Sequence, residues 1–222
     1  MSILATAGPE KEAVAGVVAR GIEWARVMGT ERENPGEVHR IEISPPAWIG
    51  SVAPVGMAVD SREARMGLAI ELARRNIERG DGGPFGAVVF EASSGRVIAA
   101  GVNSVVRLGN SSLHAEVVAL MFAQRARGSY TLAEEPACEL VTSCEPCAMC
   151  LGATLWSGVR RVVCGAGRED AVACGFDEGP VFEASYEYLR DRGIEVVRGV
   201  RRGEAAEVLR EYVRRGGRVY NA

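Results

Sequence analysis

Apolar residues recur with two different spacings along most of this chain. Stripes at every third or fourth position indicate amphipathic helices, and short runs rich in Val, Ile and Ala indicate buried strands. The helical pattern covers residues 62–79, 114–127, 146–156, 180–191 and 204–215. The strand pattern covers residues 87–92, 96–103, 137–143, 160–166 and 193–200. Strands separated by helices predict a layered α/β domain.

Turn and cap residues mark several of these boundaries. Ser61 can cap the first of these helices, and the stretch Gly80–Pro84 breaks it. Ser93–Gly95 joins the first two strand runs and predicts a hairpin. Pro146 fits the first turn of the helix that follows the third strand. These signals agree with the spacing of the apolar residues.

The beginning of the chain follows a different pattern. Residues 10–28 have helical apolar spacing, and a polar loop follows them. Three prolines at positions 45, 46 and 54 then predict an extended coil. We expect an N-terminal extension over residues 1–60 and a folded domain over residues 61–222. The extension either wraps the domain, mediates assembly or forms a partly disordered leader.

Composition narrows the classes of protein to which the chain can belong. Of its 222 residues, 47% are hydrophobic and 25% are charged, which excludes a mainly disordered chain. No apolar run reaches the roughly 18 residues of a membrane span. Residues 1–8 carry no basic region, so no secretory signal is visible and a cytoplasmic location is expected. The net charge of −3 gives no reason to expect nucleic acid as a partner.

Cysteine and histidine provide the first candidate chemistry. In a reducing compartment, clustered cysteines favour a metal site over disulfides. Cys147 and Cys150 lie three residues apart at the start of a predicted helix, where the free N–H groups stabilise thiolates. His114 can supply a third ligand. Three protein ligands leave a fourth position open for water, as in catalytic zinc sites, and Glu116 can approach that position without being a ligand.

Three other interpretations of the cysteines stay open at this point. Cys144 could join His114, Cys147 and Cys150 in a structural zinc site with four protein ligands. The cysteines could instead be small buried residues of the core. A redox site of the thioredoxin type is a third interpretation, although Pro146 before Cys147 is not its usual surrounding.

Two motifs carry a family resemblance: HAE at residues 114–116 and PCAMC at residues 146–150. They match the H-x-E and P-C-x-x-C signature of zinc deaminases. Over residues 61–200 the chain resembles the cytidine deaminase superfamily, in the branch of tRNA adenosine deaminases and bacterial guanine deaminases. Several segments are similar to guanine deaminases: GGPFGAVVF (82–90), GVNSV (101–105), HAEVVAL (114–120), TSCEPCAMCLGA (142–153) and GFDEGP (175–180).

This resemblance implies a fold, a cofactor and an assembly. The fold would be a three-layer α/β/α arrangement, cytidine deaminase-like, with a central five-stranded mixed sheet. One Zn²⁺ per chain would be held by His114, Cys147 and Cys150, and the chain would form a homodimer or a larger assembly. The long N-terminus departs from the compact guanine deaminases.

The resemblance also implies roles for individual residues. Glu116 would be the general acid and base, and Glu178 would assist proton transfer to the leaving amine. The substrate-binding residues would be Asn103, which would hydrogen-bond the purine, Phe85 and Trp156 as apolar walls, and Ala115. Without the resemblance, Asn103 could simply cap a turn, Phe85 and Trp156 could be core residues, and Glu178 could be a loop carboxylate. Tyr220 could close the pocket.

The expected reaction is hydrolytic deamination of guanine to xanthine and ammonia by a zinc-activated water. Aminated s-triazines such as ammeline could be side substrates. A nucleoside deaminase for guanosine or cytidine, and a tRNA adenosine deaminase, are the alternatives within the superfamily. A structural zinc protein without activity is the alternative from another class, and Glu116 argues against it.

Overall fold

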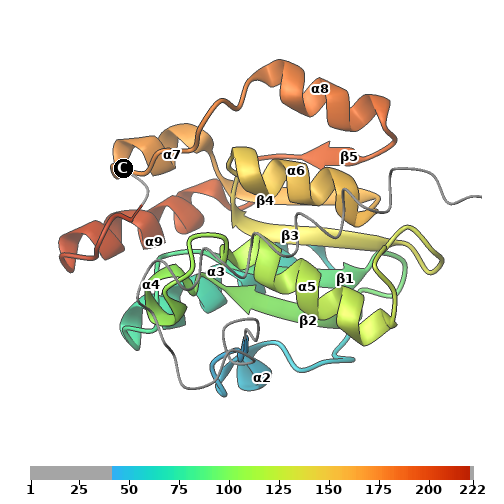
Figure 1. Cartoon of the computed structure of the whole chain (residues 1–222), viewed down its shortest axis with the longest axis horizontal. Coiled ribbons are helices and arrows are strands. Elements are labelled where there is room, and N and C mark those ends of the chain that lie inside the picture. Colours follow the sequence, from blue (N-terminus) through green and yellow to red (C-terminus); the bar gives the residue numbers. More distant parts are fainter. Residues whose placement is uncertain (1–41, 221–222) are drawn as a thin grey trace, which may run out of the picture. The chain divides into compact units, whose positions relative to one another are not determined.

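A five-stranded mixed sheet forms the centre of the protein (Figure 1). The structure is a computed structural model, and it describes residues 42–220. Along the sheet the order is β2-β1-β3-β4-β5. The strands are β1 (Gly86–Glu91), β2 (Val97–Val102), β3 (Cys138–Cys144), β4 (Arg161–Ala166) and β5 (Glu195–Val197). β1 runs antiparallel to both β2 and β3, whereas β3, β4 and β5 are parallel to one another. The predicted sheet and its hairpin are confirmed.

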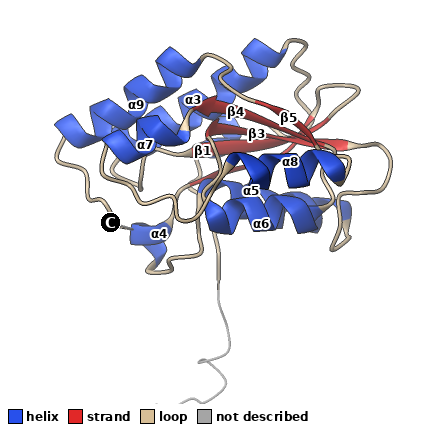
Figure 2. Cartoon of the chain, turned by 90° about the horizontal axis from the view of Figure 1, so that it is seen from above, coloured by secondary structure: helices blue, strands red, loops and turns tan. Residues whose placement is uncertain are grey.

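Helices cover both faces of this sheet (Figure 2). One face carries α3, α7 and α9, and the other carries α5, α6 and α8. The helices are α2 (Ile49–Val52), α3 (Arg62–Glu78), α4 (Val105–Leu108), α5 (Ala115–Arg127), α6 (Ala148–Ser157), α7 (Arg168–Ala173), α8 (Glu183–Asp191) and α9 (Arg202–Arg214). Each face buries its own apolar cluster, as a three-layer α/β/α fold requires. None of these helices is long and apolar enough to cross a membrane.

The start of α3 shows how closely local sequence signals are followed. The side chain of Ser61 accepts a hydrogen bond from the backbone N of Ala64 at 3.1 Å, so the predicted cap is present. The predicted stripe from Met66 to Ile77 is buried against the sheet. The helix ends at Glu78 with Arg79 as its C-cap, and Gly80 follows with a φ of +70° that suits glycine.

Residues 44–60 differ from the expectation. The compact unit that contains the sheet begins at Ser44, ahead of the expected boundary at residue 60. The extended coil predicted here is wrong at α2, where Ile49 and Val52 are buried in the core. The prolines limit the helix to one turn, but burial of these apolar side chains favours it. The helix expected at residues 10–28 lies outside the described residues.

Two further boundaries need correction. Pro146 is not inside a helix, because α6 begins at Ala148 with Cys147 as its N-cap. The last strand is shorter than the predicted 193–200 and covers only β5. The sequence does not predict α4, which follows β2 after two residues. One helical turn is too short to show an apolar period.

The strand directions gather several loops at one end of the sheet. β3 and β4 both end there, and their C-terminal residues Cys144 and Ala166 are paired. β1 starts at the same end and β2 finishes there, with Gly86 opposite Val102. The segments next to these four strand ends contain Phe85, Asn103 and Cys147. Ligand sites of α/β proteins form at the carboxyl ends of parallel strands, where loops converge in this way.

Candidate metal centre and active site

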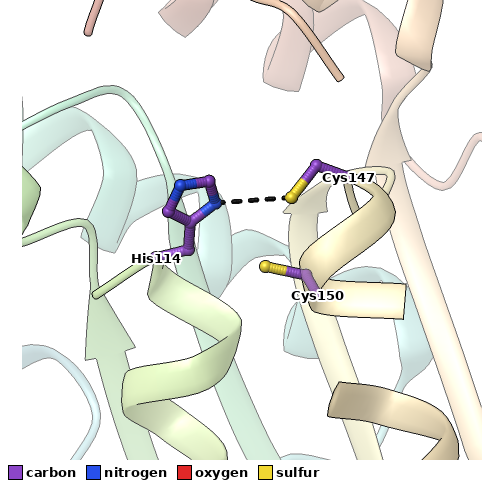
Figure 3. Close-up of side chains that lie close together, drawn as sticks. All are labelled: His114, Cys147 and Cys150. Carbon is purple, nitrogen blue, oxygen red and sulfur yellow. Dashed lines mark hydrogen bonds between the residues drawn. The ribbon is translucent and has the colours of Figure 1, made fainter. Parts of the chain in front are cut away.

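Three side chains with metal-binding atoms meet at the N-termini of two neighbouring helices. His114 is the N-cap of α5, Cys147 is the N-cap of α6, and Cys150 lies in the first turn of α6. His114 Nδ1 lies 3.5 Å from Cys147 Sγ (Figure 3). The ligand atoms of the three residues all lie within 4.8 Å of one another. Within residues 42–220, no other cluster of three or more His, Cys, Asp or Glu side chains brings its ligand atoms this close together.

Gly101 in β2 allows α5 to lie close enough to the sheet for His114 to reach the two cysteines. A Cβ at Gly101 in β2 would lie 2.5 Å from the backbone O of Ala115 and 2.5 Å from the backbone N of Ala119. Only glycine therefore allows the first turn of α5 to lie directly on β2. Because His114 and Glu116 belong to that turn, their positions depend on this close approach.

The donor set fits zinc. In a tetrahedron with Zn–S near 2.3 Å and Zn–N near 2.1 Å, neighbouring ligand atoms are roughly 3.6–3.8 Å apart. The separation of 3.5 Å between His114 and Cys147 is close to that edge. Cys144, the proposed fourth ligand of a structural site, does not belong to the group. It is buried in the cluster on the opposite face of the sheet, beneath α3 and α9, so three protein ligands remain.

The two thiols differ in charge because of their surroundings. Cys150 and His114 share hydrogen bonds with Cys147, and these lower the pKa of the Cys147 thiol to about 4. The pKa of Cys150 is raised well above its usual value, first by its hydrogen bond to Cys147 and then by burial. Burial lowers the pKa of His114, but the hydrogen bond to Cys147 and the nearby negative charges raise it more. A bound cation favours the deprotonated form of both thiols.

Glu116 projects from the first turn of α5 toward the same three residues. It is only 5% exposed. Its carboxylate accepts hydrogen bonds from Thr142 Oγ1 at 3.2 Å and from Cys150 Sγ at 3.4 Å. Both donors are neutral, so they do not balance its charge. Burial and the negative charge of Cys147 raise the pKa of Glu116, whereas His114 opposes the rise.

A second carboxylate faces the same pocket. Glu178 lies in the loop after α7, and the backbone N of Ala148 holds this loop by donating to Glu178 O at 3.0 Å. Burial and the charges of Cys147 and Glu116 raise the pKa of Glu178 to about 8. This shift favours the protonated form of its carboxyl group in the metal-free site.

The pocket above the three metal-binding residues is narrow. Its lining residues are Phe85, His114, Glu116, Glu145, Cys147, Glu178 and Tyr220. The cavity volume of about 10 Å³ has room for about one water molecule. A water in this place would lie beside the open metal position and both carboxylates.

Tyr220 fills much of the space that a larger ligand would need. Its ring lies edge-on to Phe176 at 5.6 Å and to His114 at 6.2 Å. Its hydroxyl is buried and has no hydrogen-bond partner within the described residues. A Cβ at Gly83 would come within 2.9 Å of this ring and 3.3 Å of Asn103 Oδ1. The ring, Gly83 and the Asn103 amide thus form one contact group at the side of the pocket.

The side-chain amide of Asn103 forms hydrogen bonds through its oxygen but not through its nitrogen. Its Oδ1 accepts from the backbone N of Gly83 and of Val105, both at 3.4 Å. Its Nδ2 is buried without a partner among the described residues. A buried unpaired donor costs about 1–3 kcal/mol, so an acceptor on a ligand would be favoured there.

Of the four expected substrate-binding residues, Phe85 lines this pocket, Asn103 adjoins it only through Gly83 and the Tyr220 ring, and Ala115 and Trp156 lie away from it. Trp156 is near the far end of α6 and 81% exposed, and it does not line this pocket. Eight residues of helix separate it from Ala148, a rise of roughly 12 Å. Ala115 is fully buried in the core between α5 and the sheet and does not line the pocket.

Sequence analysis missed Glu145, which the structure places in the pocket wall. The one available signal was its position between a buried strand and Pro146, where a charged residue is unusual. Glu145 is 5% exposed and forms an ion pair with Arg198. The pairing joins residues 53 positions apart, so no local pattern could indicate it.

A histidine and two cysteines beside an open position, with a buried glutamate in reach, define the class of zinc-dependent hydrolases that activate water. Comparison with known proteins gives the family. Residues 59–166 match the model of the cytidine and deoxycytidylate deaminase zinc-binding region. The chain belongs to this deaminase family and is a zinc-dependent aminohydrolase.

Two individual relatives carry different names. The chain is 41% identical to the guanine deaminase of Bacillus subtilis over 115 residues, 52% of this chain and 70% of that protein. It is 37% identical to a tRNA(Ile)-lysidine synthase of Deinococcus radiodurans over 177 residues, 79% of this chain but only 29% of that protein.

Solved structures show the same fold. A guanine deaminase from Nitrosomonas europaea superposes with a TM-score of 0.74 at 47% identity, covering 78% of this chain and 96% of that one. A structure in complex with 2,6-diaminopurine gives a TM-score of 0.76 at 47% identity, covering 81% of this chain and 96% of that one.

Proposed function

We propose that this protein hydrolyses guanine to xanthine and ammonia. The observation that carries the proposal is the second buried carboxylate, Glu178, which lines the pocket together with Glu116, His114 and Cys147. A guanine amine is a poor leaving group, so a second proton donor has a chemical purpose. The guanine deaminase relatives and the solved complex with a diaminopurine support the same substrate class.

In this proposal His114, Cys147 and Cys150 hold the zinc ion. The ion, when bound, lowers the pKa of a coordinated water toward neutrality and so supplies the nucleophile. Glu116 takes the proton that this water loses and delivers it to N3 of the purine as C2 is attacked. The raised pKa of Glu116 suits this role, because a carboxylate with raised pKa holds a proton more readily.

Glu178 acts in the later step, when the amine leaves C2. Burial and the negative charges of Cys147 and Glu116 raise its pKa to about 8 in the metal-free site, which favours a carboxyl group that can give a proton to the amine as the bond to C2 breaks. Glu116 takes the proton that the C2 hydroxyl loses as it becomes the carbonyl. The bound cation lowers this pKa, and the negative charges of Cys147 and Glu116 oppose that change.

Binding of the purine uses the side of the pocket next to Gly83. Asn103 Nδ2, which lacks a partner, would donate to an acceptor on the purine, and the ring of Phe85 would contact its face. Ligand pockets commonly enclose about 300 Å³ or more, far above the present cavity volume. Tyr220 therefore has to move outward when guanine enters, and it closes the pocket when the site is empty.

The deciding experiment is a substrate panel of guanine, guanosine, cytosine, cytidine, adenine and ammeline, with ammonia release as the measurement. Guanine should give the highest kcat/KM, and ammeline, which presents a similar aminated edge, should react more slowly. Faster turnover of guanosine or cytidine would assign the protein to the nucleoside deaminases. Activity on a tRNA anticodon stem and none on free bases would favour the tRNA adenosine deaminase alternative.

Assembly and location complete the proposal. The outer surface of α5 and α6 exposes Met121, Met149 and Trp156, an apolar set that a second copy of the chain would cover in a homodimer. The cysteines of the described part are all free thiols, which suits the cytoplasm. Sedimentation of the wild type and of Trp156→Glu tests the dimer, which should be weakened by the buried charge.

A further inference from the structure

Glu145 is the one charged side chain of the pocket wall that has no part in the proposed reaction. It is immediately followed by Pro146 and by the metal-binding Cys147. Its carboxylate is nearly inaccessible to solvent, with a side-chain exposure of 5%. Burial of a carboxylate costs several kcal/mol unless partners compensate it. The partners of Glu145 therefore show what this burial achieves.

Four hydrogen bonds hold the carboxylate in a fixed orientation. Arg198 binds both oxygens, through Nε at 2.6 Å and Nη2 at 3.2 Å. Tyr186 Oη donates at 3.1 Å, and the backbone N of Arg168 donates at 3.3 Å. The guanidinium of Arg198 also stacks over the Tyr186 ring, 4.5 Å from its centre. Such a bidentate and stacked arginine restricts the orientation of the carboxylate much more than a single contact would.

The same group of contacts reaches the loop that carries Glu178. Arg168 begins α7, and its Nη2 donates to the backbone O of Gly179 at 3.4 Å. On the other side of this loop, the backbone N of Ala148 donates to Glu178 O at 3.0 Å. The loop thus touches both the residue that follows Cys147 and the residue whose backbone holds Glu145.

We propose that Glu145 and Arg198 are positioning residues, which fix the turn carrying Cys147 relative to the loop carrying Glu178. Glu145 does not belong to the group of metal-binding atoms, so it acts through Cys147 and not as a ligand. Arg198 has a second effect, because it balances a third carboxylate at a pocket wall that already contains Glu116 and Glu178. The proposal rests on the proposed function only in taking Cys147 as a zinc ligand and Glu178 as a proton donor.

The protein offers a matched control for this pair. Glu139, at the opposite end of β3, has a side-chain exposure of 3% and accepts from Arg161 Nη1 at 3.0 Å. Each carboxylate keeps another donor when one arginine is removed: Tyr186 for Glu145, and Arg65 for Glu139. Arg161 and Arg198 are also similarly exposed, at 30% and 35%. The variants Arg198→Gln and Arg161→Gln each remove one arginine from a buried carboxylate, one beside the pocket and one remote from it. Glu139 keeps the charge of Arg65 and Glu145 keeps only neutral donors, so the melting temperature is needed to separate lost stability from lost positioning.

The experiment measures three quantities for both variants of the zinc-loaded, full-length protein. They are the rate of zinc release to a chromophoric chelator, the kcat and KM for guanine, and the melting temperature. Partners that orient metal ligands commonly change metal affinity or activity by about 10- to 100-fold. We expect Arg198→Gln to release zinc at least ~10-fold faster and to lower kcat more than it raises KM. Arg161→Gln should leave both within about 2-fold while lowering the melting temperature.

Equal zinc release and equal kcat in the two variants would overturn the proposal, because the pair would then contribute stability alone. Zinc release needs no substrate, so its result stands even if guanine is not the substrate. If Arg198→Gln does not fold, Tyr186→Phe removes one neutral donor of the same carboxylate, and Arg198→Lys keeps the charge but not the bidentate geometry. Both should then show faster zinc release than Arg161→Gln, and wild-type release in both would refute the proposal.

Discussion

Buried carboxylates lie at both ends of strand β3. At one end arginines balance the negative charge, and at the other end two carboxylates have no arginine partner. At the start of the strand, Glu139 contacts Arg65 at 2.6 Å and Arg161 at 3.0 Å. At the other end, the side-chain donors to Glu116 are a hydroxyl and a thiol, both neutral, and the described residues contain no ion pair for Glu116 or Glu178. Paired carboxylates stabilise a fold, whereas unpaired ones have raised pKa values and can carry protons.

Glu145 lies at the same end of β3 as Glu116 and Glu178, but like Glu139 it has an arginine partner. It forms an ion pair with Arg198, although it lines the same pocket as Glu116 and Glu178, and we propose that this pairing excludes it from proton transfer. In the proposed mechanism, an arginine partner thus distinguishes the positioning residue Glu145 from the proton carriers Glu116 and Glu178, whereas burial does not. The following predictions test this separation, from the largest effect on activity to the smallest.

Removal of a metal ligand should have the largest effect. Cys150→Ala deletes one of the three ligands, so the zinc content should fall from about one per chain to near zero, and activity should be lost with it. Metal analysis of the purified protein and ammonia release measure the two effects. Cys144→Ala is the control, since this thiol lies in the cluster beneath α3 and should leave the zinc content near normal. Loss of zinc from both variants would restore the structural site with four protein ligands.

Removal of the first unpaired carboxylate should have the next largest effect. Glu116→Gln keeps the shape and the hydrogen bond from Thr142 but cannot carry a proton. Turnover should fall by at least ~10²-fold, while zinc stays bound and guanine still binds. Equilibrium binding together with steady-state kinetics separates the two properties. Near-normal turnover in a zinc-replete Glu116→Gln protein would remove Glu116 from the mechanism.

A smaller effect should follow from the second unpaired carboxylate. Glu178→Gln removes only the proton for the departing amine, so kcat should fall roughly 10-fold or more with KM changed by a few-fold at most. An interaction made only in the transition state shows itself in kcat. A raised KM with unchanged kcat would mean that Glu178 holds the substrate and does not donate a proton.

Local patterns in the sequence predict most of the sheet and the zinc ligands, but not the balance of charge. His114, Cys147 and Cys150 are readable because each lies at a helix start that short motifs mark. The sequence predicts the helix that contains Trp156, but a motif at its start does not show which way the last turn faces, so the exposure of Trp156 could not be predicted. The partners of Glu139 and Glu145 come from residues 22 to 74 positions away. Pairing over such separations depends on the tertiary fold, and one sequence holds no local signal for it.

Glu139 provides the last and sharpest test of the comparison. Glu139→Gln removes the charge that balances Arg65, whose side chain is only 11% exposed, and should lower the free energy of unfolding by about 3 kcal/mol. Turnover and zinc content should nevertheless stay within about 2-fold, because Glu139 lies at the end of β3 away from the pocket. Urea unfolding and steady-state kinetics on the same preparation measure both. Arg62→Gln is the control, since its contact with Glu195 at 3.8 Å is exposed and should contribute less than ~1 kcal/mol. A fall in kcat as large as that of Glu178→Gln would show that paired and unpaired carboxylates are not separated in this way, and that the two ends of β3 act as one electrostatic unit.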